Sequence, residues 1–322
     1  DGEEVGYAVR PADATKTTIF VPDANLWDFD EPYLYTVVAE LQRRNETYDD
    51  IEVRVGVRSF SCDPQKGFII NGVETPLRGV SRHQDINYIG NALDEEDHYA
   101  DALLIKELGA NTIRLAHYQH SQDFYDACDE IGFAIWAEIP FISVMSKNPA
   151  AHQNCIEQMK ELVVQNYNHP SIFFWGISNE ILIGGISEEL VANHKELNAL
   201  VKEMDPTRLT TIACVSMCKM DDPYVQIPDV VSYNHYFGWY GGDTSMNGPW
   251  FDKFHKMFPN IPIGCSEYGC EALNWHTSDP KQGDYTEEYQ AYYHEELIKQ
   301  LYSRKYIWAT HVWNMFDFGA DA

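Results

Sequence analysis

The sequence predicts an α/β protein in which a (β/α)8 TIM barrel follows part of an immunoglobulin-like β-sandwich domain. Three observations lead to this fold class. The chain has 322 residues, which is enough for two domains at roughly 150 residues each. Its first sixty residues show only strand patterns, whereas short apolar runs and longer amphipathic segments alternate after them, as in parallel β/α units. We therefore expect a partial sandwich over residues 1–60 and a barrel over residues 61–322.

The sandwich prediction rests on three β-branched and aromatic runs. They lie at 17–21, 32–41 and 50–60, with turn residues such as Asn45 and Asp49 between them. An immunoglobulin-like sandwich normally has about seven strands. Three strands are too few, so we expect the sequence to begin inside this domain.

The barrel prediction rests on eight apolar runs, the number of strands in a (β/α)8 barrel. The runs lie at 75–81, 111–116, 133–138, 171–178, 208–213, 230–234, 261–267 and 306–314. Helical patterns lie between them at 95–109, 121–132, 155–167, 188–204 and 287–303. No helical pattern follows the eighth run, so we expect the barrel to lack its last helix.

Composition and charge exclude several classes of protein. Hydrophobic residues make up 44% of the chain and charged residues 23%, which are globular proportions. No run of about 18 uncharged apolar residues is present, so we expect no membrane span. The net charge of -27 repels phosphate backbones, so we expect no nucleic-acid partner. The amino terminus lacks a basic segment followed by an apolar one, so no signal peptide is visible and the cytoplasm is the expected location.

Carboxylates follow several of the predicted strands, at the end of the barrel where active sites gather. Glu180 and Glu267 stand out because each directly follows a run that should line the barrel, where an unpaired charge is costly to bury. We expect them to face each other across the barrel mouth. Glycosidic bond cleavage needs such a pair, although either residue alone would also fit an ion pair with an arginine or a helix cap.

Side chains of the kind that bind sugars occur at the same strand ends. They are aromatic rings, amides and imidazoles, all of which also occur in ordinary packing, and they comprise His83, His117, Asn179, Asn234, Tyr236, Trp239 and Trp313. Arg114 lies on a predicted barrel strand. Because a buried arginine is rarely left unpaired, we expect it to orient a neighbouring carboxylate.

Ordered motifs along the chain resemble one known family. They are FIINGVETPLRGVSRHQD at 68–85, NTIRLAHY at 111–118, NHPSIFFWGISNE at 168–180, SEYG at 266–269 and VWNMFDF at 312–318. Single motifs such as NE are common, but this series at barrel spacing is specific. The chain resembles the family 2 glycoside hydrolases, which include β-galactosidases and β-glucuronidases.

The resemblance implies a retaining, two-carboxylate mechanism without a cofactor. Glu267, in the SEYG position, would be the nucleophile, and Glu180, in the NE position, would act as acid and then as base. The remaining matched residues would bind substrate: Asn179 at the sugar 2-hydroxyl, Tyr236 at the nucleophile, Trp313 as the floor, and His83, Asp85 and His117 in the glycone pocket.

The motifs favour an exo-acting β-galactosidase whose partner is a small oligosaccharide or β-glycoside. The SRHQD segment followed by GNAL at 90–93 is similar to β-galactosidases, whereas SYNHYFGWY at 232–240 is similar to β-glucuronidases. β-Glucuronidase is therefore one alternative, and a carbohydrate-binding barrel without catalysis is another. The sequence leaves a homo-oligomer open, because no self-complementary surface can be recognised in it.

No metal site is predicted. Some large β-galactosidases place an additional Glu and His after the third barrel strand to hold magnesium, whereas residues 137–145 offer Glu138 without such a pair. A metal-dependent hydrolase would need converging histidines. His83, His117 and His235 lie among sugar-type residues and form no HxH pattern.

Overall fold

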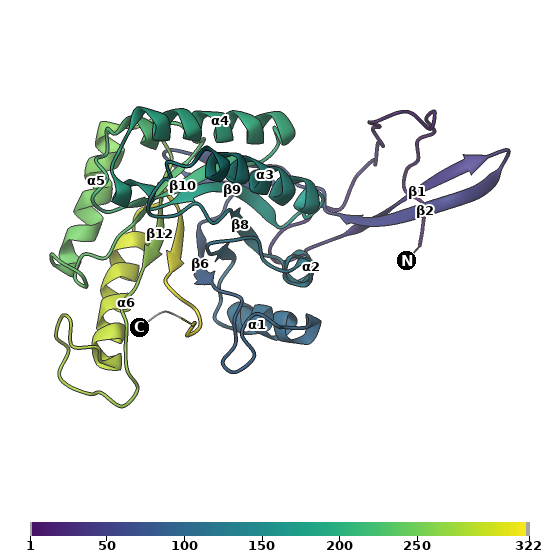
Figure 1. Ribbon diagram of the computed structural model, residues 1–322. Helices are drawn as coiled ribbons and strands as arrows, with labels where there is room; N and C mark the ends of the chain where they lie inside the picture. The colour runs from purple at the N-terminus through teal and green to yellow at the C-terminus, as the bar shows by residue number, and fades with distance from the viewer. Residues whose placement is uncertain (1, 320–322) are drawn as a thin grey trace.

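The eight predicted runs form one closed barrel of parallel strands in the computed structural model, which describes residues 2–319 (Figure 1). Each strand pairs with the next along the chain, and the last pairs with the first. The strands are β6 (Leu77–Arg82), β7 (Thr112–Leu115), β8 (Ala134–Glu138), β9 (Ile172–Asn179), β10 (Leu209–Val215), β11 (Val231–Asn234), β12 (Ile263–Tyr268) and β13 (Ile307–Val312). The predicted fold class is confirmed.

Six α-helices of the described chain lie around the barrel (Figure 1). They are α1 (Glu95–Glu107), α2 (Gln122–Ile131), α3 (Pro149–Asn166), α4 (Glu188–Met204), α5 (Asn247–Met257) and α6 (Glu287–Tyr302), with short 3₁₀ segments at η1 (Ile181–Gly184), η2 (Pro223–Gln226) and η3 (Thr244–Met246). The sequence does not predict α5, because Gly248 and Pro249 in its first turn are poor helix formers. A proline is tolerated in the first helical turn, and Phe251 and Phe254 bury the inner face.

The amino-terminal part contributes one antiparallel hairpin of the sandwich, β1 (Tyr35–Arg43) with β2 (Glu46–Val55), which extends away from the barrel in Figure 1. The two turn residues, Arg44 and Asn45, both have positive φ, as a tight two-residue hairpin turn requires. The predicted strand at 17–21 is wrong. That segment has no strand partner among the described residues, and the β-branched residues alone do not make a strand.

A small antiparallel sheet closes the amino end of the barrel. It consists of β3 (Phe60–Asp63), β4 (Gly67–Ile70) and β5 (Val73–Glu74). The Phe68 ring lies 5.9 Å from that of Phe174, whose ring in turn lies 4.5 Å from that of Trp308. These aromatic contacts fill the amino end of the barrel with apolar side chains. The polar side chains gather at the carboxyl end.

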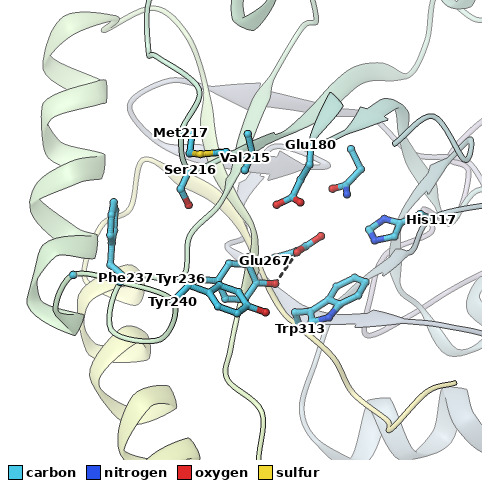
Figure 2. Close-up of a pocket in the computed structure, with 13 residues that line it drawn as sticks. His117, Glu180, Val215, Ser216, Met217, Tyr236, Phe237, Tyr240, Glu267 and Trp313 are labelled. Carbon is cyan, nitrogen blue, oxygen red and sulfur yellow. Dashed lines mark hydrogen bonds between the residues drawn. The ribbon is translucent and has the colours of Figure 1, made fainter. Parts of the chain in front are cut away.

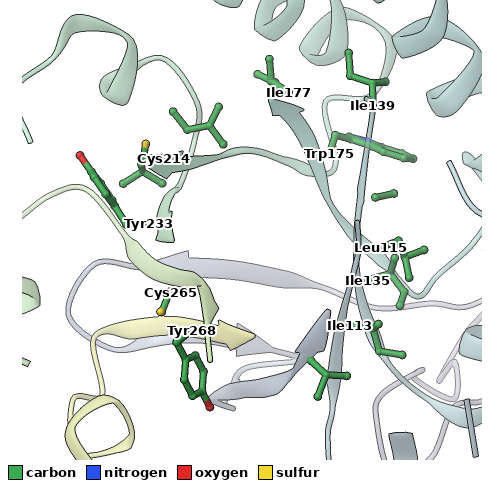
Figure 3. Packing of buried hydrophobic residues seen from close by; sticks show 14 of the residues in the cluster. Ile113, Leu115, Ile135, Ile139, Trp175, Ile177, Cys214, Tyr233, Cys265 and Tyr268 are labelled. Atoms are coloured by element: carbon green, nitrogen blue, oxygen red, sulfur yellow. The ribbon is translucent and has the colours of Figure 1, made fainter. Parts of the chain in front are cut away.

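The strands alternate between apolar side chains that face the helices and side chains that face the barrel interior. Ile113, Leu115 and Ile135 belong to the outer layer shown in Figure 3. Because successive residues of a strand point to opposite faces, Arg114 and Glu138 point into the barrel. The outward apolar residues thus determine which polar residues enter the site.

None of the described helices combines the length and the apolar character needed to cross a membrane. All seven cysteines are free thiols. Burial raises the pKa of the Cys128 and Cys214 thiols well above the usual range. These thiols therefore stay protonated inside the fold.

Candidate active site

A cavity of about 710 Å³ opens at the carboxyl end of the barrel (Figure 2). Six predicted site residues line it, from five different strands or the loops after them: His117, Asn179, Glu180, Tyr236, Glu267 and Trp313. Figure 2 shows the carboxyl groups of Glu180 and Glu267 pointing into the same space. The structure therefore brings together residues that are up to about 200 positions apart in the sequence.

Glu267 lies on β12 and is held by two hydrogen-bond donors. The pairing of β12 with its neighbours shifts register around Ser266 and Glu267, so both side chains turn inward where strict alternation would allow only one. Arg114 donates from Nη1 to Oε1 of Glu267 over 2.6 Å, and Tyr236 donates from its hydroxyl to Oε2 over 2.7 Å. Burial and the charge of Glu267 raise the pKa of Tyr236 well above its usual range, so this donor keeps its proton.

Glu180 directly follows β9 and has a different environment. Its backbone is left-handed, with φ of 49°, and its N–H donates to the Ala213 carbonyl over 2.8 Å. A non-glycine residue in this region is uncommon and points to a functional constraint. The side chain accepts one neutral hydrogen bond, from Nδ2 of Asn234 over 3.0 Å.

The two carboxyl groups are thereby prepared for opposite roles. Burial and then the nearby charge of Glu267 raise the pKa of Glu180. Glu267 instead accepts from a guanidinium and a phenol, both of which stabilise a carboxylate. Two titratable groups whose surroundings differ in this way can serve as an acid and a nucleophile in one site.

Asn234, on β11, connects Glu180 with Asn179 and Ser266 through neutral hydrogen bonds. Its Nδ2 also donates to Oδ1 of Asn179 over 3.1 Å, and its Oδ1 accepts from the Ser266 hydroxyl over 2.6 Å. Oδ1 of Asn179 accepts a second bond, from Nη2 of Arg114 over 2.9 Å. Both acceptor positions of Asn179 are therefore used, which leaves its amide nitrogen to donate toward the cavity.

Residues 64–322 match the model of the family 2 glycosyl hydrolase TIM barrel domain, and residues 3–58 match the model of the family 2 glycosyl hydrolases. The chain belongs to glycosyl hydrolase family 2. The family resemblance of the sequence motifs is confirmed.

Several relatives of this family 2 chain carry the name β-glucuronidase. A crystal structure of an FMN-binding β-glucuronidase from Facaelibacterium prausnitzii is 65% identical with a TM-score of 0.97, over 99% of this chain and 50% of that one. A β-glucuronidase from Bacteroides fragilis is 39% identical over 94% of this chain and 45% of its own length. A β-galactosidase from Bacteroides ovatus is 26% identical over 95% and 42%. The chain spans about half the length of these relatives.

His83 and Asp85, which the family resemblance placed in the glycone pocket, do not line the family 2 cavity. The His83 ring lies edge-on to Trp313 at 5.4 Å, behind the cavity wall, and burial and then His117 lower the pKa of His83 to about 4. Asp85 accepts from the N–H of Gly319 over 2.6 Å. In the described structure, both residues support the segment around Trp313, whose indole stacks on His117 at 4.9 Å.

Other cavity residues are not predicted from the sequence. They come from the end of β10 and from the segments after β10 and β11, none carries a charge, and they comprise Val215, Ser216, Met217, Phe237, Tyr240, Gly241 and Gly242. Trp239, by contrast, is buried and packs against Tyr285 at 4.9 Å. The seven cavity residues could have been recognised from their position at or after a strand end, since loops at this end of a barrel form the site.

Among residues 2–319, one group of side chains has the spacing of metal ligands: Asp126, Asp129 and His169. It joins the end of α2 to the start of β9, at the amino end of the barrel and away from the cavity. The carboxylate of Asp129 already accepts from the Ser171 N–H over 3.0 Å and lies 2.6 Å from Nδ1 of His169. These contacts are those of a hydrogen-bond network between a helix and a strand.

The three histidines considered for a metal-dependent hydrolase do not converge. His235 points into an aromatic cluster, with its ring 4.1 Å from Trp250 and 5.2 Å from Phe251. Burial lowers the pKa of His235 to about 3. His83 and His117 lie near each other, with ring centroids 5.7 Å apart, but His235 does not join them.

Proposed function

We propose that this protein is a retaining exo-acting β-glucuronidase. The single observation that carries the catalytic part is the pair Glu180 and Glu267, which share one cavity in opposite electrostatic surroundings. The choice of glucuronides draws support from the named relatives at 65% and 39% identity. The sequence motifs favour β-galactosides, and that preference has weaker support, from a relative at 26% identity.

In the first step, a carboxylate oxygen of Glu267 attacks the anomeric carbon, and the bond from this carbon to the aglycone oxygen breaks. Protonated Glu180 gives its proton to the leaving oxygen. Arg114 and Tyr236 hold the two oxygens of Glu267 and direct the carboxylate toward the sugar. The product of this step is a covalent glycosyl-enzyme.

In the second step, the Glu180 carboxylate takes a proton from water as the water oxygen attacks the anomeric carbon. The bond to Glu267 breaks, and the sugar leaves with its original β configuration. Neither of these two reaction steps transfers electrons. The mechanism therefore does not use the FMN that is named for the F. prausnitzii protein.

The two candidate substrates, a β-glucuronide and a β-galactoside, differ in the sugar that the cavity must bind. Among the described residues that line the cavity, none is Lys or Arg. The described lining therefore offers amide and hydroxyl donors, such as Asn179 and Tyr240, to either sugar. Direct comparison of a glucuronide with a galactoside is the sharpest test.

The experiment is hydrolysis of 4-nitrophenyl β-glucuronide, β-galactoside, β-glucoside and β-mannoside by the purified protein, with Glu267→Gln as the control. We expect kcat/KM to be highest for the glucuronide. Dominant turnover of the galactoside would replace the proposed substrate and leave both carboxylates in their roles. A folded protein that hydrolyses none of the four would support the carbohydrate-binding alternative.

A further inference from the structure

Glu138 is a third buried carboxylate, beside the cavity rather than in its lining. It ends β8 with 1% of its surface exposed. Its neighbour in the barrel is Gly176 on β9, where an added Cβ would lie 2.6 Å from Cβ of Glu138 and 2.3 Å from Nε1 of Trp136. The side chain is therefore confined, and its hydrogen bonds go only to Arg114 and His117 among the described residues.

Glu138 holds one edge of the Arg114 guanidinium. Nε of Arg114 donates to Oε2 of Glu138 over 3.2 Å, and Nη2 donates to Oε1 over 3.0 Å. Nη1, at the other edge, faces Oε1 of Glu267. A two-bond contact of this kind fixes the plane of a guanidinium. Glu138 thus sets the direction from which the cation meets Glu267, and two carboxylates share one positive charge.

The same contacts determine which nitrogen of His117 carries a proton. Nη2 of Arg114 has two hydrogens, and both have acceptors: Oε1 of Glu138 and, over 2.9 Å, Oδ1 of Asn179. No hydrogen remains for Nδ1 of His117, which lies 3.2 Å from this Nη2. Nδ1 also lies 2.7 Å from Oε1 of Glu138. An ionised carboxylate can only accept, so Nδ1 must be the donor.

Glu138 is charged in this arrangement. Burial acts to raise its pKa, but Arg114 and His117 together hold the pKa of Glu138 below its usual value. With Nδ1 protonated, Nε2 of a neutral His117 is left as an acceptor on the ring that lines the cavity. A sugar hydroxyl is the donor that such an atom can bind.

We propose that Glu138 is a positioning residue of this site. It directs Arg114 at Glu267, and it fixes His117 as the Nδ1–H tautomer, so that Nε2 accepts from a substrate hydroxyl. The kinetic part of this inference rests on the proposed glycosidase function. The tautomer is a property of the resting protein and does not depend on turnover.

The test compares Glu138→Gln with Asp205→Asn. Gln has nearly the shape of Glu but no charge. Asp205 is also fully buried and accepts from an arginine, Arg208, over 2.8 Å, but it precedes β10 at the amino end of the barrel. Its variant therefore controls for the loss of a buried ion pair without touching the site.

Two readouts are needed. The ¹⁵N chemical shifts of the His117 ring, assigned with His117→Gln, report the tautomer. We expect the Nδ1–H form in the wild-type protein and in Asp205→Asn, and its loss as the single form in Glu138→Gln. On aryl and alkyl glycosides, we expect Glu138→Gln to lower kcat/KM about 10- to 100-fold, by analogy with residues that orient the ligands of a metal site. The factor should be similar for both leaving groups, since Glu138 acts through Glu267 and not through Glu180.

Two results would overturn the role of Glu138, and a third would contradict the proposed function alone. An Nε2–H tautomer in the wild-type protein would overturn the inference even if Glu138→Gln does not fold. So would a folded Glu138→Gln whose kcat/KM and tautomer match the wild type. Absence of turnover by the wild-type protein, with the Nδ1–H tautomer present, would contradict the proposed function and leave the role of Glu138 in orienting His117 standing.

Discussion

Arg114 and Glu267 form a buried ion pair across the barrel, with Nη1 and Oε1 2.6 Å apart. They come from β7 and β12, which are not paired strands, and are separated by 153 positions in the sequence. The guanidinium simultaneously binds Glu138. This one cation therefore fixes two carboxylates whose mutual repulsion would otherwise disfavour the folded barrel.

Replacement of this cation should affect both stability and activity. Arg114→Gln leaves Glu138 and Glu267 buried without a counter-charge, and breaking such a pair costs about 3–5 kcal/mol. We expect a lower free energy of unfolding and a large loss of kcat. Urea unfolding and steady-state kinetics measure the two effects. Arg208→Gln, which breaks an ion pair at the amino end, should lower stability while the folded fraction keeps its kcat. Equal kcat values for the two variants would refute the assignment of Arg114 to the catalytic site.

Removal of the proposed acid should depend on the leaving group. Glu180→Ala cannot protonate the departing oxygen, so alkyl glycosides should lose far more rate than 4-nitrophenyl glycosides, whose leaving group needs little protonation. The ratio of kcat/KM for the two substrates, measured in wild type and variant, gives the effect. A similar loss on both substrates would argue against Glu180 as acid.

The pH dependence of the rate should follow the ionisation of Glu180. Burial and Glu267 raise its pKa, so the carboxyl group stays protonated above the usual range of a glutamic acid, about 4.3 in model peptides. As pH rises through this raised value, the acid is lost and kcat/KM for alkyl glycosides should fall. This fall on the alkaline side of the pH profile of kcat/KM should be absent in Glu180→Ala. An alkaline limb unchanged in the variant would assign it to another group.

The same ionisation should cost stability. A carboxyl group whose pKa is higher in the folded than in the unfolded state favours unfolding once pH exceeds the unfolded value, and the full penalty is present above the folded value. Glu180→Gln removes the penalty. We expect its Tm to exceed that of the wild type at neutral pH and the difference to shrink as pH falls into the range where Glu180 is protonated. A lower Tm for Glu180→Gln at neutral pH would contradict this account.

Much of the fold follows from local sequence, because each barrel strand lies in a short apolar run. The site carboxylates follow from the same pattern: Glu180 directly follows one such run, and Glu267 lies at the end of another. Strands that depend on partners are less predictable. The run at 17–21 has strand-forming residues and no neighbouring strand among the described residues, whereas α5 forms despite Gly248 and Pro249.

The environment of a side chain is harder to infer than its position. Glu138 reads as a strand-end carboxylate, but its contacts with Arg114 and His117 depend on strand pairing and on the inward direction of alternate residues. The register shift that turns Glu267 inward has no local signature either. Short motifs also discriminate poorly between sugars, since the GNAL segment favours β-galactosides while the relatives at higher identity are named β-glucuronidases.

The most direct test of the central claim is to trap the proposed covalent intermediate. Incubation with a 2-deoxy-2-fluoro-β-glucuronosyl fluoride, followed by peptide mass spectrometry, shows which residue carries the sugar. We predict a label on the peptide at Glu267 and none in Glu267→Gln. A label on Glu180 or Glu138, or turnover with inverted configuration and no label, would contradict the assignment of Glu267 as the nucleophile.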